Sequence, residues 1–95
     1  MPAFVIVEIE IHDHDLYKTY TLLTPPSIAS FQGEFVVRGG ETTILEGDWQ
    51  PKRLVMLKFP SVEMANSWWH SEEYSKARKI RQQAATTRMI IVEGV

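Results

Sequence analysis

The feature that most constrains this chain is the segment of residues 53–59, which would carry apolar side chains on both faces if it were extended. Val55, Leu57 and Phe59 point one way in an extended chain, and two further apolar residues point the other. A strand that is apolar on both faces is typical of the interior of a sheet. The segment therefore predicts a central strand around which the other elements are arranged.

Other segments of the chain also have the pattern of strands. Residues 3–11 place four apolar side chains on one face, while the other face begins apolar and turns acidic at Glu8 and Glu10. Residues 34–38 and 42–48 flank Gly39-Gly40, so we expect them to pair through a tight turn. Residues 88–95 form the last predicted strand.

Capping residues mark the predicted helices. Asp13 is a good N-cap for a helix that runs to about residue 23, where Pro25 and Pro26 are expected to end it before a short helical turn at residues 26–31. Ser61 opens a second helix that runs to about residue 70. Ser71 opens a third helix, which we expect to end at Thr86-Thr87.

This order of elements predicts an α+β fold for residues 1–95 as a single domain. The pattern is the ferredoxin-like βαββαβ with an extra hairpin strand, in which helices cover one face of an antiparallel sheet. The other face stays uncovered and carries apolar residues of several strands. We therefore expect a homodimer through the open sheet face.

Composition excludes several classes of protein. With 10 basic and 12 acidic residues and no basic stripe, nucleic acid is not an expected partner. The chain has no cysteine, which removes disulfides and thiolate chemistry. The apolar N-terminal run is interrupted by acids, so we expect neither a signal peptide nor a membrane span, and a cytoplasmic protein is the default.

The chain resembles the small bacterial proteins called domain of unknown function 1330, within the dimeric α+β barrel superfamily. The resemblance covers nearly the whole chain and lies in the order and spacing of short motifs. These are Val5-Ile6-Val7, Asp13 with Tyr17 and Tyr20, Arg38-Gly39-Gly40, Glu46-Gly47-Asp48-Trp49 with Pro51, Arg53-Leu54, Phe59-Pro60, Trp68 with Ser71 and Tyr74, Arg81-Gln82 and Val92-Glu93-Gly94-Val95.

The resemblance implies two subunits that pair their sheets into a barrel, with pockets between sheet and helices. Relatives in the superfamily include cofactor-independent monooxygenases, muconolactone-isomerase-like proteins and haem-handling proteins, and the family itself has no agreed activity. His14 and His70 depart from the family pattern, so the resemblance assigns neither a role.

Arg38 and Glu46 flank the predicted hairpin, so we expect them on one face as a catalytic pair. A structural cross-strand ion pair is the alternative. Tyr74 is the third catalytic candidate, because its phenol can donate a proton in the cleft between sheet and helices. Tyr17 and Tyr20 are expected to bind substrate there, and amphipathic core tyrosines are the alternative for all three.

Three more residues complete the predicted substrate-binding set. Trp49 could wall the pocket or pack at the dimer interface. His70 is the natural base if the chain is an enzyme, with a surface histidine as the alternative. Arg81 could reach a ligand carboxylate or pair with Glu93 or Glu46.

His12-Asp13-His14-Asp15 resembles a metal cluster, but alternate residues of an extended segment point opposite ways, so we interpret it as a capping turn and expect no metal.

Three functions remain open from the sequence. The first is a homodimeric enzyme without a cofactor that acts on a small anionic or carbonyl compound by proton transfer. The second is a non-catalytic dimer, stress-associated or otherwise, that binds a small ligand. The third is a haem-handling or oxygenase-type protein, which needs a histidine directed into the cavity.

Overall fold

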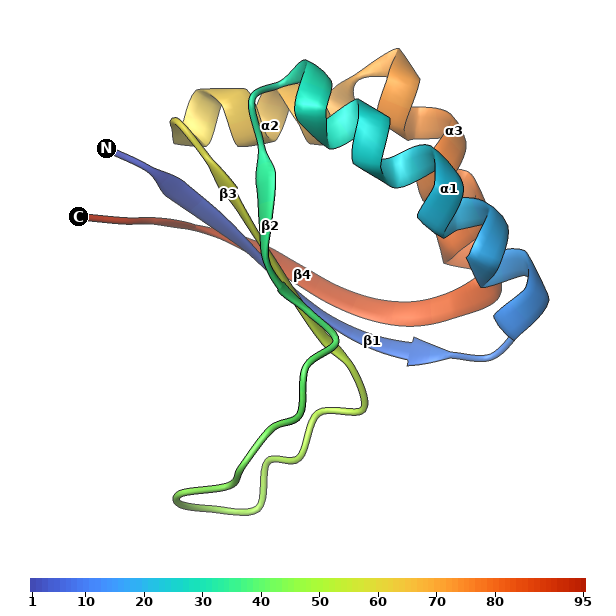
Figure 1. Ribbon diagram of the computed structural model, residues 1–95, viewed down its shortest axis with the longest axis vertical. Coiled ribbons are helices and arrows are strands. Elements are labelled where there is room, and N and C mark those ends of the chain that lie inside the picture. Colours follow the sequence, from blue (N-terminus) through green and yellow to red (C-terminus); the bar gives the residue numbers. More distant parts are fainter.

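The computed structural model describes residues 1–95 and shows three helices packed on one face of a four-stranded antiparallel sheet (Figure 1). The elements follow the order β1 (Ala3–Ile11), α1 (His14–Ser30), β2 (Glu34–Arg38), β3 (Leu54–Phe59), α2 (Val62–His70), α3 (Glu72–Ala84) and β4 (Ala85–Glu93). This confirms the predicted α+β, ferredoxin-like βαββαβ order. No helix has the length and apolar character needed to cross a membrane.

The strands lie in the order β2-β3-β1-β4, so β1 and β3 are the interior strands and β2 and β4 are the edges. Val5 of β1 lies opposite Leu57 of β3 on one side and opposite Ile91 of β4 on the other. These residues face the helices, where the sheet packs against Trp68 of α2 and Tyr74 of α3. The prediction that residues 53–59 form a central strand is confirmed.

The predicted end of α1 at residue 23 is wrong, because the helix continues through Pro25 and Pro26 to Ser30. Each proline removes one helical hydrogen bond, at a cost of about 3 kcal/mol in a helix interior. Tertiary packing offsets that cost: Ser27 and Ile28 are buried, and the Trp68 indole donates to the Ser27 hydroxyl over 3.1 Å.

The junction of α3 and β4 also lies earlier than predicted. The helix ends at Ala84 and the strand begins at Ala85, where residues 85–87 were expected to finish the helix. The long first strand explains the difference, since Ile11 pairs with Ala85 and β4 therefore matches β1 over its full length. The earlier start places Thr87 on the face of the sheet that carries the helices.

A β-bulge in β2 changes which residues share its inner face. Phe35 lies opposite Leu57, but Arg38 lies opposite Val55, so two residues three apart both face the helices. The guanidinium of Arg38 stacks on the Phe35 ring, with its central carbon 4.3 Å from the ring centroid.

The predicted extra hairpin strand does not form. Residues 42–48 belong to a long connection between β2 and β3, residues 40–52, which we call the arm and which projects from the sheet on the side away from the helices (Figure 1). Pairing residues 42–48 with β2 would bury one apolar side chain on each face, whereas β3 buries three residues of the core. The chain leaves the sheet at Gly39, whose φ of 75° favours glycine and whose missing side chain makes room for Arg53.

Candidate functional site

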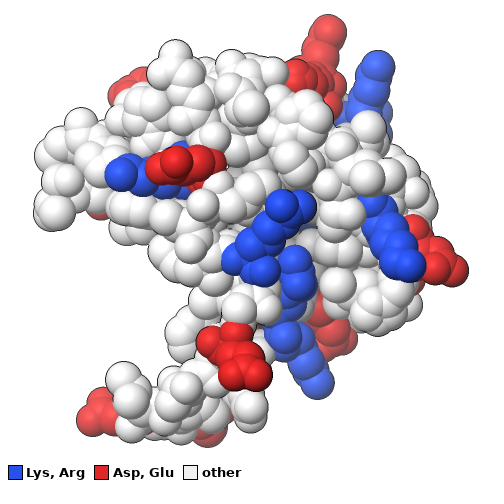
Figure 2. Space-filling model, in the orientation of Figure 1, with Lys and Arg blue, Asp and Glu red and all other residues white.

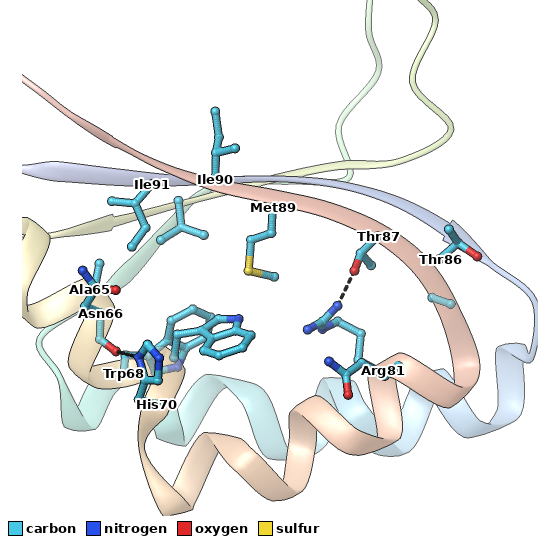
Figure 3. A pocket seen from close by; sticks show the side chains of 14 residues that line it. Ala65, Asn66, Trp68, His70, Arg81, Thr86, Thr87, Met89, Ile90 and Ile91 are labelled. Atoms are coloured by element: carbon cyan, nitrogen blue, oxygen red, sulfur yellow. Dashed lines mark hydrogen bonds between the residues drawn. The ribbon is translucent and has the colours of Figure 1, made fainter.

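A cavity of about 650 Å³ lies between the outer strand β4 and the helices α2 and α3 (Figure 3). Its floor is made by the inner-facing residues of β4, and its wall by the end of α2 and the last turns of α3. The volume is in the range of sites that hold small organic molecules. It is lined by Val5, Ala65, Asn66, Trp68, Trp69, His70, Arg81, Gln82, Ala85, Thr86, Thr87, Met89, Ile90 and Ile91.

Arg81 is the only cationic side chain that is fully buried, with 3% of its surface exposed. Its Nε donates to the Tyr74 hydroxyl over 3.2 Å and its Nη1 to the Thr87 hydroxyl. No carboxylate lies within 4.0 Å of the guanidinium, because the only ion pairs in the chain are Arg88–Glu8 and His12–Glu10.

The expected alternative, in which Arg81 pairs with Glu93 or Glu46, is therefore wrong. A buried charge is ordinarily compensated by a partner charge. Two neutral hydroxyls use two of the five N–H donors of the guanidinium. Figure 3 shows the side chain extending from α3 into the cavity. The arrangement provides a positive, incompletely satisfied group for an anion, most naturally a planar carboxylate.

His70, the last residue of α2, also lines this cavity. Its Nδ1 lies 2.9 Å from the main-chain carbonyl oxygen of Asn66. A carbonyl only accepts hydrogen bonds, so we assign the proton of the neutral ring to Nδ1, which leaves the lone pair on Nε2. The ring packs edge-on against Trp69, with the two centroids 4.9 Å apart. The fold therefore brings one base and one cation to the same cavity.

Three buried tyrosines lie behind the cavity. The hydroxyl groups of Tyr20 and Tyr74 are 2.8 Å apart, and Tyr74 also accepts the bond from Arg81. Tyr74 is fully buried and does not line the cavity, so it holds Arg81 in place and does not reach a ligand there.

Burial determines the protonation of the other two phenols. Desolvation raises the pKa of Tyr20 well above the ordinary 10.0, and the Tyr74 hydroxyl adds to the effect. Desolvation also raises the pKa of Tyr17, and the charge of Arg53 opposes it. Both phenols are therefore neutral at physiological pH and can donate protons but not accept them as phenolates.

A second, much smaller cavity of about 30 Å³ lies between α1 and the β2–β3 side of the sheet. It has room for about one water molecule. Tyr17, Tyr20, Arg38 and Arg53 line it, and the buried Nε of Arg53 has no hydrogen-bond partner. The predicted Arg38 therefore lies at a site different from that of His70 and Arg81.

The predicted pair of Arg38 and Glu46 is not formed. Glu46 is exposed on the arm and makes no ion pair, because the chain leaves the sheet at Gly39 and does not fold back beside β2. Trp49 also lies outside both cavities. Its indole N–H donates to Glu8 over 2.7 Å on the open face of the sheet.

Glu8 holds the base of the arm. It also accepts a hydrogen bond of 2.9 Å from Arg88 of β4. The hydrogen bond from Trp49, followed by that from Arg88, lowers the pKa of the Glu8 carboxyl. These contacts place Trp49 at the open sheet face and not at the wall of a cavity, so the first of its two expected roles is wrong and packing at a dimer interface stays a prediction.

At the N-terminus of α1, the Asp13 carboxylate accepts from the main-chain N–H of Leu16, and His12 bonds the Thr86 hydroxyl over 2.6 Å. No group of three or more potential ligands could hold a metal ion. The segment is the capping turn that the sequence indicated.

Sequence reasoning missed Asn66 and Thr87, the residues of the larger cavity that bond to His70 and Arg81. Asn66 lies four residues before His70, and this helical spacing alone could have suggested the contact of its carbonyl with the imidazole. Thr87 was missed because the predicted strand started at residue 88, whereas β4 starts at Ala85.

Comparison with solved structures supports the fold. A protein of unknown function from Rhodopseudomonas palustris is 20% identical, with a TM-score of 0.78 over 99% of this chain and 82% of the other. A dimeric ferredoxin-like protein of unknown function from Jannaschia sp. CCS1 is 12% identical, with a TM-score of 0.75 over 99% of this chain and 100% of the other. SnoaB, a cofactor-independent oxygenase from Streptomyces nogalater, is 10% identical, with a TM-score of 0.71 over 99% of this chain and 93% of the other.

No curated protein matches this sequence. The family described as "Domain of unknown function (DUF1330)" matches residues 2–95, which confirms the resemblance drawn from the motifs. The chain belongs to the DUF1330 family.

Proposed function

We propose that this protein is a homodimeric enzyme without a bound cofactor that moves a proton on a small carboxylate-bearing carbonyl compound. The observation that carries the proposal is Arg81, a buried guanidinium without a carboxylate partner, in the same cavity as the free Nε2 of His70. Arg81 binds the substrate carboxylate. His70 removes a proton from the carbon next to the carbonyl group, and the electron pair of the C–H bond moves into the enolate.

The same imidazole returns its proton to the enolate at carbon or at oxygen, so no oxidant or other co-reactant is needed. The indole rings of Trp68 and Trp69 provide apolar walls for the remainder of the substrate. The likeness to SnoaB, itself a cofactor-independent oxygenase, supports chemistry without a cofactor on this fold.

Deuterium exchange tests the proton transfer. Phenylpyruvate in D₂O is followed by NMR, and the wild-type protein is expected to accelerate loss of the signal of the carbon-bound protons next to its keto group. His70→Gln should remove that acceleration and keep binding, and Arg81→Met should weaken binding. Lys79→Met is the matched control, because it removes one positive charge from an exposed position of the same helix. Acceleration retained by His70→Gln would refute the assignment of the base.

A non-catalytic ligand-binding protein is the second candidate. One observation favours it: His70 is the single side-chain base that lines the cavity, and it is exposed. Binding that depends on Arg81, without deuterium exchange in any of several keto acids, would support this function over the enzyme.

The homodimer is proposed through the open sheet face. Ile90 and Val92 of β4 are 60% and 44% exposed on that face, which the helices do not cover. Apolar surface of this kind usually marks an interface, and the similar Jannaschia protein is dimeric. Light scattering should give twice the chain mass of 11.0 kDa, and a single chain mass would refute the dimer.

A further inference from the structure

The arm is the one long segment whose backbone is not satisfied within the chain. Of the 56 backbone–backbone hydrogen bonds, none outside the helices and strands involves residues 40–52. The arm also exposes apolar side chains, with Leu45 91%, Trp49 60% and Ile44 45% exposed. Its only side-chain hydrogen bond to the body of the protein is that of Trp49 with Glu8.

An extended, unpaired segment with exposed leucine and isoleucine gains stability from a partner that offers backbone hydrogen bonds and apolar surface. Residues 42–45 read Thr-Thr-Ile-Leu, a composition that favours strands. The sequence therefore predicts a strand here, and the single chain contains no strand edge beside which it lies.

The outer edge of β4 is a complementary surface. β4 pairs only with β1, so the backbone groups along its other edge are free. The same edge borders the larger cavity, whose lining includes Thr86 and Ile90 on the open face as well as the inner-facing Thr87 and Met89. Whatever lies along this edge therefore covers the entrance to the cavity.

Charge also matches these two surfaces. The arm carries Glu41, Glu46 and Asp48 and has no basic residue before Lys52. Figure 2, in the orientation of Figure 1, shows acidic side chains on the arm and no basic side chain at its tip. The cavity is cationic, with Arg81 in its lining, and Arg78 lies over its lining residue Trp69, 4.1 Å from the ring centroid.

We propose that the arm of one subunit lies along β4 of its partner and closes the partner's cavity. This inference rests on the proposed homodimer and adds that each site is completed by the other chain. A two-fold axis parallel to the strands of two facing sheets brings the β2 edge of one subunit over the β4 edge of the other. The arm, which leaves the sheet beside β2 and projects past its open face, then runs beside the partner's β4 (Figure 1).

Residues 42–45 add to the β4 edge by strand addition, and their apolar side chains contact Ile90 and its neighbours. The acidic residues of the arm lie toward the cationic entrance. Glu46, which lines neither the larger nor the smaller cavity of its own chain, gains a place at the partner's site.

Cross-linking between two differently sized chains tests the arrangement. The chain has no native cysteine, so each engineered thiol is unique. Leu45→Cys on one chain and Ile90→Cys on a second, tagged chain are mixed, allowed to exchange subunits and treated with a short bismaleimide. The expected product is a covalent heterodimer. Leu22→Cys mixed with Ile90→Cys is the control, since Leu22 is 76% exposed on α1, on the helical side, and should give none.

Light scattering on the same samples tests the homodimer separately from the placement of the arm. If the protein is dimeric but yields no more cross-linked heterodimer than the control, the placement of the arm is wrong and the homodimer stands. Monomers overturn the homodimer and this inference with it.

Binding of 2-naphthoate provides a second readout. Leu45→Asp should weaken its affinity about tenfold, because an arm that no longer docks leaves the cavity open. Leu22→Asp should leave the affinity unchanged. Equal affinity in the wild type and Leu45→Asp would show that the arm does not close the site.

Discussion

Replacing Arg81 with methionine separates a binding role from a structural one. The guanidinium is 3% exposed and has two neutral hydroxyls as partners and no carboxylate. Methionine keeps much of the volume and removes the charge. Because no carboxylate loses its partner, the substitution avoids the penalty that follows from breaking a buried ion pair.

The stability of the variant can be worked from these contacts. Two hydrogen bonds from a charged donor are lost, each worth about 1.5–3 kcal/mol, and Tyr74 keeps its bond to Tyr20. The desolvation cost of an unpaired buried charge, which is several kcal/mol, is removed at the same time. We therefore expect the free energy of unfolding in urea to fall by no more than about 1 kcal/mol, or to rise.

The affinity for an anionic ligand should fall much more than the stability. Hydrogen bonds from a charged donor contribute about 1.5–3 kcal/mol, so the affinity for 2-naphthoate should fall about 10- to 100-fold. The neutral analogue 2-naphthalenemethanol should bind wild type and variant equally. At a ligand concentration of about 100 times the wild-type Kd, the wild type should gain about 2.7 kcal/mol of stability. The variant, for which the same concentration is only about 1–10 times Kd, should gain about 0.4–1.4 kcal/mol.

Isothermal titration and urea unfolding, with and without ligand, measure both quantities, with Lys79→Met as the matched control. A loss of more than about 3 kcal/mol of stability in Arg81→Met would show that the guanidinium is a structural element. Equal affinity of wild type and variant for 2-naphthoate would refute the anion site.

Three further predictions concern the scaffold. Gly33→Ala should destabilise the fold by about 1–3 kcal/mol in urea unfolding, because the new Cβ would lie 2.5 Å from the Phe59 ring, whereas Gly40→Ala, which meets nothing within 4 Å, should have little effect. The contacts of Glu8 in the folded protein lower its pKa, so the stability that these contacts contribute is present above the ordinary carboxyl value of 4.5 and is lost as the pH falls through the lowered pKa. The fluorescence of Trp49 should therefore change on acidification with a midpoint below pH 4.5, and Glu8→Gln should not show this change. The raised pKa of Tyr20 has the opposite consequence: the stability that the neutral phenol contributes is fully present below pH 10.0 and is lost at higher pH. The free energy of unfolding of Tyr20→Phe should therefore fall less steeply than that of the wild type as the pH rises above 10.0. An identical alkaline profile in the two proteins would contradict the burial argument.

The strands and helix starts followed from local pattern. Asp13, Ser61 and Ser71 cap the three helices as predicted, with their side chains accepting bonds from main-chain N–H groups three residues later. These signals act within one turn of chain, so a single sequence contains all of the information they need.

The errors arose where distant parts of the chain compete with a local preference. Pro25 and Pro26 favour the end of a helix, but Trp68, some 40 residues away, stabilises the turns that follow. Residues 42–48 have the composition of a strand, but β3 takes the place beside β2 and leaves them unpaired. A local stretch of sequence around either segment does not include the distant residues that decide its structure.

The candidate site was predicted in its residue types and not in its arrangement. The sequence indicated Arg81 and His70 as ligand-binding residues, and they do share a cavity. It also grouped Arg38, Glu46 and Tyr74 as catalytic residues, which lie at the smaller cavity, on the arm and behind Arg81, respectively.

By itself, the sequence determined the order of the three helices and of the four strands that form, the apolar face of each and the existence of an uncovered sheet surface. These follow from side-chain periodicity, which is a local property. The tertiary structure alone decided that Arg81 is buried without an acid, that His70 presents Nε2 at the same cavity and that the arm stands unpaired. Each of these depends on which remote segments lie together, because burial, ion pairing and strand pairing are relations between parts of the chain.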